Sequence, residues 1–508
     1  MDFLKELSPR DYQIKIAETC IRSNCLVVIP TGLGKTLIAL IVTIERMKQF
    51  PGERVLFLAP TKPLAEQHFK YFKKYLPELF AEMNLFTGNI NAEKRKKIWQ
   101  NTEIIFSTPQ CIANDVKNRL YNLNDVCLLI EDEAHRCLKN YDYTSVAYAY
   151  KAQAQNQRII GLTASPGSEK SKIQQICKHL SIEEVELRTR ESEDVAKYLQ
   201  ELTFEKVSLE FPAEFEIVRN QLRRIFGRCV EQLRARSLIF GSTSKTELIN
   251  LQKKISFALS SGNKNFSYIA GASICAQAIK IQHALELLET QTLSGFIDYM
   301  KELEKQAKNK QSKGVIKLVE SNEFQAALKV AEHIFESGRE HPKIQKTLEL
   351  INENGGKVII FTQFRDTASI LSKKISETLK LNSKMFVGQA KKKDTGMNQK
   401  EQREILNEFA EGKINVLCAT CIGEEGIDIP EVNTVIFYEP VASAIRTIQR
   451  AGRTARLMEG KLIILITKNT RDESYYYVAK AKEKKMYSAI SSIKDELKGG
   501  AQRTFEGF

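Results

Sequence analysis

The feature that most constrains the fold is a repeated alternation between short apolar runs and helix-compatible stretches. Between residues 25 and 190, five runs look like buried strands, and each is followed by a polar turn and a helical pattern. This order is typical of a parallel sheet with helices on both faces. Ligands of such open sheets bind at the carboxyl ends of the strands, so we expect a site there. The five runs are CLVVIP (25–30), VLFLAP (55–60), IIFSTP (104–109), VCLLIE (126–131) and RIIGLTAS (158–165).

The alternation stops in the middle of the chain and then returns. From residue 213 to about 340 apolar residues recur at helical spacing, as in Val218, Leu222 and Ile225, with arginines between them. These arginines fit a solvated surface and a nucleic-acid contact equally well. A second set of strand-like runs follows: KVIIFTQ (357–363), MFVGQ (385–389), INVLCAT (414–420), NTVIFYEP (433–440) and KLIILIT (461–467). The sequence therefore predicts an α/β fold of two parallel-sheet domains with an inserted all-helical domain.

Length and residue usage narrow the class of protein. At 508 residues the chain is too long for one compact core, so two or three domains are expected. No apolar run reaches membrane-spanning length and residues 1–20 lack a signal-peptide core, which predicts a cytoplasmic protein. The ten cysteines are scattered apart from Cys418 and Cys421, so we interpret them as buried reduced thiols. The six histidines are not clustered and indicate no metal site.

The chain carries an excess of positive charge. Its 76 lysines and arginines against 62 acidic residues give a net charge of +14. In a cytosolic protein this balance points to a polyanionic partner, most often nucleic acid. A highly charged surface selected for thermal stability explains the same composition. Charge alone therefore favours a nucleic-acid partner without deciding the matter.

The stretch VVIPTGLGKT (27–36) runs from a strand into the loop Thr31-Gly32-Leu33-Gly34-Lys35-Thr36. Glycines let the backbone wrap a phosphate, and the helix that follows points its amide groups at it. Lys35 would meet the β- and γ-phosphates, and the Thr36 hydroxyl would hold Mg²⁺. Ile29 stands where the first glycine of this loop is usually found. The loop predicts binding of ATP with Mg²⁺.

A second motif, LLIEDEAHR (128–136), ends a buried strand in acidic residues. Asp132 would ligate Mg²⁺, and Glu133 would polarise the attacking water. The negative charges by themselves also fit the start of a helix, where acidic residues are favoured. A helix start would not explain their pairing with a phosphate loop at the end of another buried strand.

A third motif, QRAGRTAR (449–456), repeats arginine every three residues, which places the arginines along one side of a helix. Such a cluster fits a solvated or DNA-facing surface. In an NTPase, Arg453 and Arg456 would instead reach the γ-phosphate as arginine fingers, and Gln449 would orient the water. That reading puts ATP in a cleft between two domains, which hydrolysis would open and close.

Eight stretches in this order resemble the complete motif series of superfamily 2 helicases. They are PTGLGKT, APTKPLAEQH, FSTPQ, EDEAH, LTASPG, IIFTQF, GEEGIDIP and QRAGRTAR. The resemblance implies two RecA-like motor domains. Upstream, RDYQ (10–13) resembles the adenine-recognising glutamine motif, which implies that Arg10 and Gln13 contact the base of ATP.

Within that superfamily, the helical insertion and the stretch 386–409 resemble the archaeal Hef helicases, whose eukaryotic relatives are the Fanconi-anaemia M-type fork translocases. The resemblance covers about residues 5–490 and implies ATP-driven 3′-to-5′ translocation on DNA, with an insertion that grips branched duplex. Many Hef proteins continue into a nuclease domain with an ERKxxxD motif, which is missing here, so we expect a motor that does not cut DNA, whether trimmed or standing alone. The expected domains are residues 1–204 (first motor), 205–342 (helical insertion), 343–490 (second motor) and 491–508 (flexible tail).

The resemblance also implies roles for residues outside the ATP loop. Thr163 and Ser165 would couple the nucleotide site to the DNA site, and His135 would form a hydrogen bond between domains. Asp428 would contact the ribose or the domain interface. The candidates for gripping the phosphate backbone are Thr61, Lys62, Gly88, Thr108, Thr362 and Thr420, although each one singly also fits a helix cap or a turn.

The chain ends GGAQRTFEGF (499–508), in which Gln502, Phe505 and Phe508 resemble the peptide that binds the PCNA sliding clamp. Gly499-Gly500 would act as a hinge for that tail. Phe505 stands where leucine, isoleucine or methionine is usual, and the second terminal aromatic is missing. A tail that folds back on the second motor domain is the alternative.

Three functions therefore compete. The favoured one is a helicase acting on DNA forks or junctions. A double-stranded RNA translocase of the RIG-I and Dicer type shares the helical insertion, but no long extra RNA-end-binding domain is found, and the stretch 386–409 fits Hef better. A catalytically dead DNA-binding scaffold is the third, and the intact ATP motifs argue against it.

Overall fold

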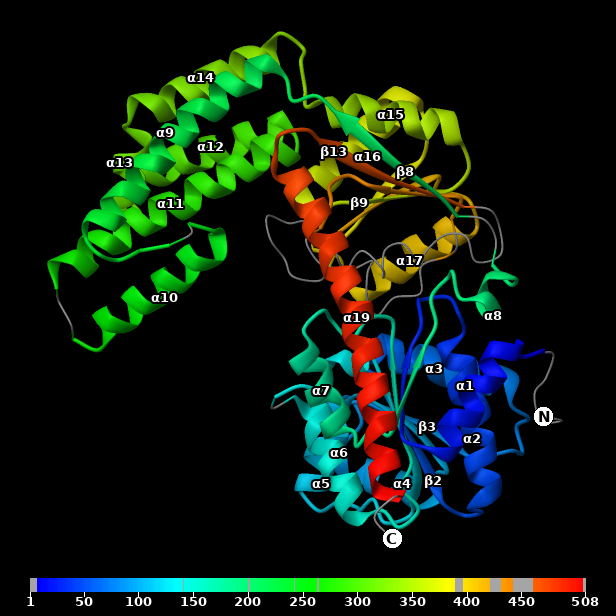
Figure 1. The fold of residues 1–508 in the computed structure, drawn as a ribbon. Helices are drawn as coiled ribbons and strands as arrows, with labels where there is room; N and C mark the ends of the chain where they lie inside the picture. Colours follow the sequence, from blue (N-terminus) through cyan, green and yellow to red (C-terminus); the bar gives the residue numbers. More distant parts are fainter. Residues whose placement is uncertain are drawn as a thin grey trace.

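Two parallel β-sheets, a helical arm and one long carboxyl-terminal helix make up the chain (Figure 1). The computed structural model describes residues 7–139, 141–199, 202–241, 243–262, 265–388, 396–420, 430, 432–441 and 460–505. Within these ranges, no helix combines the length and apolarity needed to cross a membrane. The nine cysteines that they contain are buried and unbridged.

The first α/β domain contains a seven-stranded sheet in the order β3-β4-β2-β5-β6-β1-β7. Helices α1–α3 pack on one face, and α4–α7 cover the other. The strands are β1 Cys25–Val28, β2 Arg54–Leu58, β3 Met83–Phe86, β4 Ile104–Ser107, β5 Val126–Asp132, β6 Ile159–Thr163 and β7 Glu184–Leu187. The helices are α1 Asp11–Arg22, α2 Lys35–Gln49, α3 Lys62–Tyr75, α4 Ala92–Asn101, α5 Pro109–Lys117, η1 Ala134–Arg136, α6 Asp142–Gln153, α7 Lys170–His179 and α8 Glu193–Ala196.

The second α/β domain contains a six-stranded sheet in the order β10-β11-β9-β12-β13-β8. Its central strands are buried along their whole length, which is why they read as continuous apolar runs. The strands are β8 Leu202–Leu209, β9 Val358–Phe361, β10 Ser383–Phe386, β11 Val416–Ala419, β12 Thr434–Phe437 and β13 Gly460–Thr467. The helices packed on this sheet are α15 Pro342–Asn354, α16 Arg365–Leu379 and α17 Gln399–Ala410. The predicted α/β fold with two parallel sheets is confirmed.

Residues 213–336 form the helical arm, which projects from the second α/β domain (Figure 1). One continuous apolar core joins its helices, so the arm is a packed unit with its own interior. Ser244 and Glu247 form a capping box that fixes the start of α10, since each side chain accepts the other residue's backbone N–H. The helices are α9 Ala213–Ala235, α10 Lys245–Ser260, α11 Phe266–Thr290, α12 Leu293–Lys308, α13 Lys313–Val319 and α14 Asn322–Glu336.

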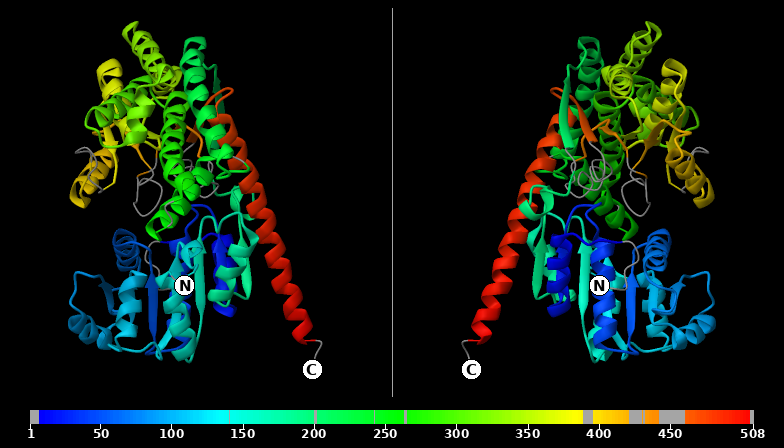
Figure 2. Two further views of the ribbon diagram at one scale, coloured as in Figure 1. Left: turned by 90° about the vertical axis from the view of Figure 1, so that its left-hand side faces the viewer. Right: turned by 90° about the vertical axis from the view of Figure 1, so that its right-hand side faces the viewer.

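Helix α19 (Arg471–Phe505) links the two α/β domains. It begins four residues after the last strand of the second sheet and runs along the outside of the first domain (Figure 2). Met486, Ala489, Ile490 and Ile493 of this helix belong to the hydrophobic core of the first domain. The helix is therefore anchored in both domains.

Three expected boundaries differ in the structure. The expected boundary at residue 204 splits residues 202–209 between the first motor and the insertion. In the structure these residues form β8, which pairs with β13 over eight residues in the second sheet. The arm is thus inserted within the second domain, not between the two. Residues 486–493, assigned in part to the second domain, pack on the first. The tail was expected to hinge at Gly499-Gly500, but α19 continues through both glycines to Phe505.

Candidate active site

The phosphate loop connects β1 to α2 at the carboxyl edge of the first sheet. Gly32 and Gly34 have φ angles of +87° and +79°, a region that favours glycine. In the part of the chain that the structure describes, no side chain caps the first turn of α2, which fits amide groups that a phosphate would cap. The buried Thr31 hydroxyl has no hydrogen-bond partner among the described residues, and Lys35 Nζ lies on the loop, 3.0 Å from the carbonyl of Ile29. These features fit ATP at the predicted position.

The glutamine motif supports this loop from α1. Gln13 Nε2 and the Tyr12 hydroxyl both donate to the carbonyl of Leu33, at 3.2 and 2.9 Å. The Gln13 side chain also accepts the backbone N–H of Arg10 at 2.9 Å. A Cβ atom at Gly34 would lie 2.3 Å from Gln13 Nε2, so only glycine fits there without displacing the amide. The predicted contacts of Arg10 and Gln13 with adenine remain a prediction.

The two expected Mg²⁺ ligands are joined by a histidine that sequence reasoning missed. His68 Nε2 lies 2.8 Å from Asp132 Oδ2, and His68 Nδ1 lies 3.4 Å from Thr36 Oγ1. His68 comes from α3 and is in the APTKPLAEQH stretch, but its partners are far away in sequence. Thr36 and Asp132 therefore lie on either side of one imidazole, and their oxygen atoms are the ligand type that suits Mg²⁺.

The three acids of the EDE stretch have different environments. Burial raises the pKa of Glu131 well above its usual range, which favours the neutral form of this carboxyl. Burial also raises the pKa of Asp132, but the hydrogen bond from His68 and the charges of His68 and Lys35 outweigh it, and the net pKa is lowered. Glu133 has φ +53° at the start of η1, next to the strand end. Asp132 is therefore held ionised at the position expected for a metal ligand.

A series of polar contacts leads from Glu133 to helix α19. His135 Nδ1 lies 3.2 Å from Glu133 Oε2 and 3.1 Å from the Thr163 hydroxyl oxygen. That hydroxyl accepts the backbone N–H of Ser165 at 3.1 Å. Ser165 Oγ in turn lies 2.9 Å from Met486 Sδ on α19. The structure thus brings the predicted coupling residues together and connects them to a residue that follows the second sheet in sequence.

The carboxyl edge of the first sheet is divided between two groups of predicted residues. Asp132 ends β5, Glu133 and His135 follow it, and the phosphate loop follows β1. Thr163 and Ser165 end or follow β6, which lies between these strands in the sheet order β5-β6-β1. Thr61, Gly88 and Thr108 follow β2, β3 and β4, which are neighbours at the other end of the sheet. Thr61 and Gly88 are exposed, and Thr61 and Thr108 precede α3 and α5 without capping them. Lys62 is the first residue of α3.

The remaining candidates lie in the second domain or outside the described residues. Thr362 and Thr420 follow the adjacent strands β9 and β11, but both side chains are buried, and the Thr362 hydroxyl lies 3.4 Å from Gln291 Oε1. This burial does not favour a direct phosphate contact in this arrangement. The candidates Asp428, Gln449, Arg453, Arg456 and Phe508 lie outside the described residues. Gln502 and Phe505 belong to α19.

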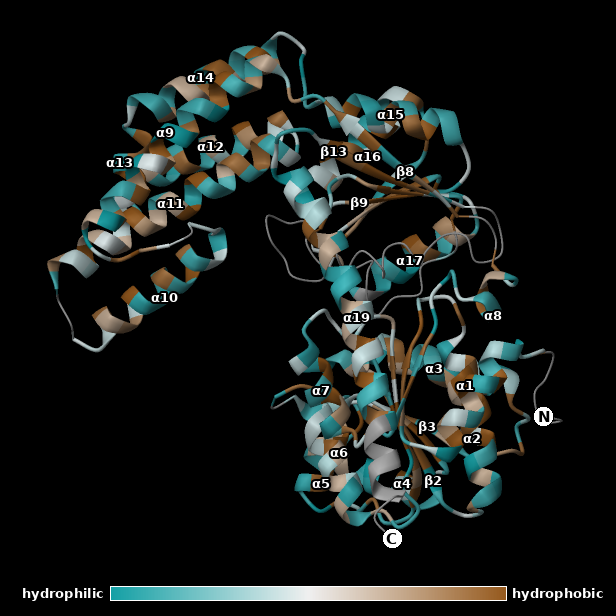
Figure 3. Cartoon of the chain, viewed as in Figure 1, coloured by the Kyte–Doolittle hydropathy of each residue, from teal (hydrophilic) through white to brown (hydrophobic). Residues whose placement is uncertain are grey.

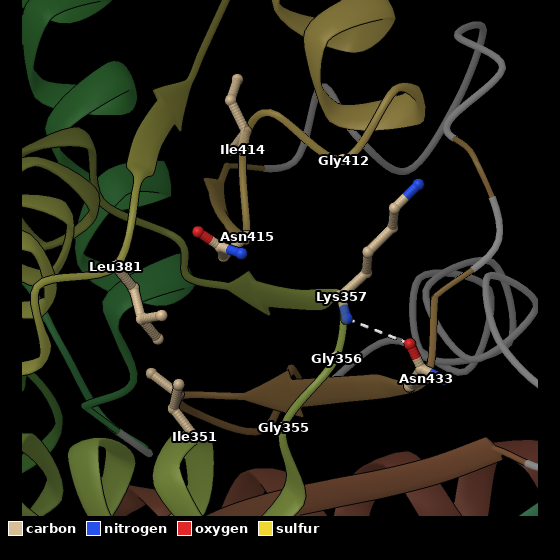
Figure 4. Close-up of a pocket in the computed structure, with 9 residues that line it drawn as sticks. All are labelled: Ile351, Gly355, Gly356, Lys357, Leu381, Gly412, Ile414, Asn415 and Asn433. Atoms are coloured by element: carbon tan, nitrogen blue, oxygen red, sulfur yellow. Dashed lines mark hydrogen bonds between the residues drawn. The ribbon is translucent and has the colours of Figure 1, made fainter.

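A cavity of about 470 Å³ lies at the opposite, amino edge of the second sheet (Figure 4). Its polar groups are used internally, because Lys357 N–H donates to Asn433 Oδ1 at 3.0 Å and Lys357 Nζ to the carbonyl of Ala410 at 2.6 Å. None of the predicted site residues that the structure describes lines it. It therefore does not compete with the strand-end site.

Three family models match successive parts of the chain. Residues 10–173 match the DEAD/DEAH box helicase model, and residues 342–458 match the helicase conserved C-terminal domain. Residues 214–338 match a helical bundle described for an ATP-dependent RNA helicase. The order of these matches agrees with the two sheets and the arm.

Two named proteins are similar to this chain over almost its whole length. A Methanocaldococcus jannaschii protein with the provisional name ATP-dependent RNA helicase is 36% identical over 96% of this chain and 61% of its own length. The Fanconi anemia group M protein homolog of Mus musculus is 32% identical over 96% of this chain and 26% of its own length. The chain thus spans about three-fifths of the first relative and a quarter of the second.

A solved structure, the Hef helicase domain of Pyrococcus furiosus, matches with a TM-score of 0.71 and 41% identity. The match covers 92% of this chain and 98% of that one. The resemblance read from the motifs is thereby confirmed. This chain belongs to the superfamily 2 helicase family of Hef and the Fanconi anaemia group M proteins.

Proposed function

We propose that the chain is an ATP-driven DNA helicase or translocase that moves 3′ to 5′ on forked and branched DNA during repair or at stalled forks. The observation that supports it most is the division of one sheet edge between the phosphate loop on β1 and the exposed Thr61 and Gly88 after β2 and β3. A change at one group can be passed along the same rigid sheet to the other. The DNA substrate is supported by relatives named as ATP-dependent DNA helicases.

In this function, different residues would bind the phosphates, bind Mg²⁺ and accept the proton of the attacking water. Lys35 and the loop amides would hold the phosphates, and Thr36 and Asp132 would hold Mg²⁺, which neutralises phosphate charge when bound. Glu133 would take up the water proton, since its carboxylate adjoins the metal ligand Asp132. The contacts through His135, Thr163 and Ser165 would carry the nucleotide state to α19 and the second domain.

The test compares the wild type with Lys35→Ala on labelled forks and four-way junctions. The wild type should displace strands with ATP, and the variant should lose both hydrolysis and displacement while still binding DNA. Unchanged fork unwinding by Lys35→Ala would show that the ATP site does not drive the activity. Retained DNA binding without ATPase activity in the wild type would instead support the scaffold.

A double-stranded RNA-dependent ATPase is the second candidate. Two names favour it, because the Methanocaldococcus relative and the helical-bundle model are both described as RNA helicases. ATPase rates with forked DNA and with duplex RNA separate the two. Stronger stimulation by duplex RNA would replace the DNA proposal.

A contact with the PCNA sliding clamp is a separate proposal for Gln502, Phe505 and Phe508. Because α19 continues to Phe505, the peptide would be presented as the end of a helix, without the hinge first expected. Deleting residues 501–508 should abolish binding to the clamp and leave the ATPase rate unchanged. Clamp binding by the shortened chain would exclude this tail as the contact.

A further inference from the structure

The free end of the helical arm exposes three phenylalanine rings. Phe240 follows α9, Phe257 is on α10 and Phe266 begins α11, and their side chains are 84%, 75% and 77% exposed. Figure 1 shows this end of the arm far from both sheets, and Figure 3 shows hydrophobic residues on α10 there. Single exposed apolar residues are ordinary, but a group of them marks a binding surface. Ile249 and Ile269 of the same helices are exposed as well.

Each ring shares a cavity lining or a helix face with a basic residue. Phe240 and Lys254 line the same cavity of about 270 Å³ between the end of α9 and α10. Phe257 lies three residues after Lys254 on α10, so the two are surface neighbours. Phe266 lines a second cavity, of about 790 Å³, whose charged lining residues are Arg228, Arg236, Lys317, Glu320 and Glu323. Aromatic rings and basic side chains therefore occur together at this end of the arm.

Basic residues strongly outnumber acidic ones in the stretch that forms this end of the arm. Residues 223–280 contain ten lysines and arginines against two acids, an excess of eight in a chain whose net charge is +14. The two acids are Glu231 and Glu247, and the second is used in the capping box of α10. The basic residues are Arg223, Arg224, Arg228, Arg234, Arg236, Lys245, Lys253, Lys254, Lys264 and Lys280. Three of them pair with acids outside this stretch, Arg223 with Glu289, Arg228 with Glu323 and Lys245 with Glu286. The seven others still outnumber the two acids, and this remaining excess complements a polyanion.

Exposed rings beside cations fit one polyanion better than others. In a paired duplex the base faces are hidden, so rings at a surface gain little from it. Unpaired nucleotides offer both a phosphate chain and open base faces, and stacking on an aromatic ring contributes about 1–3 kcal/mol per base. We propose that the end of the arm, with Phe240, Lys254, Phe257 and Phe266, binds unpaired nucleotides of branched DNA. This inference rests on the proposed function, which supplies DNA as the substrate.

The first experiment measures binding of labelled oligothymidine and of a duplex of equal length by fluorescence anisotropy. The full chain carrying Phe240→Ala, Phe257→Ala and Phe266→Ala is compared with wild type and with Phe335→Ala, a control ring on α14 that is 41% exposed. Exposed positions tolerate these changes, so the fold should be kept. The triple variant should bind oligothymidine at least about tenfold more weakly, the loss expected for about 1.4 kcal/mol, with duplex affinity within about twofold.

Equal affinity of the triple variant and wild type for oligothymidine would overturn the inference and leave the rings as a protein-binding surface. Equal losses on oligothymidine and duplex would overturn it too, because stacking on unpaired bases would not be the cause. If the proposed function itself is wrong, the ATPase rate of the wild type would not respond to DNA at all. That result distinguishes its failure from failure of the inference about the rings.

A spectroscopic variant tests stacking directly. Trp99 is the only tryptophan of the chain and is buried, so Phe257→Trp introduces a separate exposed fluorophore. Its added fluorescence should be quenched by oligothymidine and not by the duplex. An unquenched signal at saturating oligothymidine would exclude stacking at this position.

Discussion

Gly34 and Glu133 hold the backbone of the ATP site in the left-handed region. For Gly34, at φ +79°, the absence of a side chain makes this conformation accessible. Glu133, at φ +53°, has a side chain, and such a conformation costs about 1–3 kcal/mol where the surroundings enforce it. The strained residue directly follows Asp132, and its own carboxylate is the one expected to act on water. The expected catalytic carboxylate and the strained backbone therefore belong to the same residue, Glu133, at the end of β5.

Gly34→Ala should abolish ATP binding without unfolding the protein. The new Cβ would meet Gln13 Nε2, and so the loop or the glutamine must move. Gly52→Ala is the matched control, because Gly52 has φ +86° but open space around its Cβ position. Both variants should lose about 1 kcal/mol of stability from backbone strain, measured by urea unfolding. Only Gly34→Ala should lose binding of a fluorescent ATP analogue; equal nucleotide affinity in both variants would contradict the role of the Gln13 contact.

The ATP residues could be predicted from sequence because each motif is local. Gly32, Lys35 and Thr36 are in one loop, and Asp132 and Glu133 in one strand end. His68 and Met486 could not be predicted, since their site contacts join residues 64 and 321 positions apart. A signal existed for His68 alone, because it ends a stretch that resembles a helicase motif. Met486 lies outside every such stretch.

At the scale of elements, the strands that sequence patterns missed are β3, β7 and β8. All three are edge strands of their sheets. An edge strand is half exposed, so it lacks the continuous apolar run of a central strand. In β8, partly buried and exposed residues alternate from Glu205 to Leu209. The long helix α19 was missed for a different reason, since its core contacts belong to a domain more than 300 residues earlier in the sequence.

Glu286→Gln should destabilise the arm in a pH-dependent way. Burial alone would raise the pKa of Glu286, but hydrogen bonds from His283 and Lys245 and the charges of Lys245 and Arg471 lower it to about 2. A lowered folded-state pKa contributes stability that is present above the unfolded value and is lost as pH falls through the folded one. At pH 7 the loss should be about 2 kcal/mol, allowing for screening of the partly exposed Lys245.

The measurement is urea unfolding at several pH values, with the exposed Glu336→Gln as control. The difference between wild type and Glu286→Gln should be constant above about pH 5 and shrink as pH is lowered toward 3. The control should follow the wild type throughout. A difference that stays constant down to pH 3 would show that the ionised Glu286 is not the source of the stability.

Met486→Leu should uncouple ATP hydrolysis from DNA more than it affects the fold. Leucine keeps the buried volume but removes the sulfur that accepts from Ser165. Stability should change by less than about 1.5 kcal/mol, as for other volume-conserving exchanges. The ratio of DNA-stimulated to basal ATPase rate should fall severalfold, the effect of losing a hydrogen bond of about 1 kcal/mol. Met300→Leu, at an equally buried methionine of the arm, should leave the ratio unchanged.

At the scale of the whole molecule, a buried ion pair joins the arm, the second sheet and α19. Lys343 Nζ lies 2.5 Å from Asp472 on α19 and donates to the carbonyl of Thr290 at the root of α11, and both charged side chains are fully buried. Removal of one partner leaves the other charge buried without compensation. Lys343→Met or Asp472→Leu should therefore cost about 3–5 kcal/mol in urea unfolding. The double variant should be more stable than either single one, and a double variant less stable than both would refute a compensated pair.

The insertion of the arm within the second domain has a mechanical consequence. Because β8 precedes the arm and α15 follows it, both ends of the arm are fixed to one sheet, and the arm must turn with that domain. Helix α11, with 25 residues, reaches about 37 Å from this pivot to the phenylalanine end. A turn of about 10° at the pivot would sweep that end by about 6 Å, close to two nucleotide spacings. The arm would thus act as a lever, because a small rotation of the second domain displaces its phenylalanine end by several ångströms.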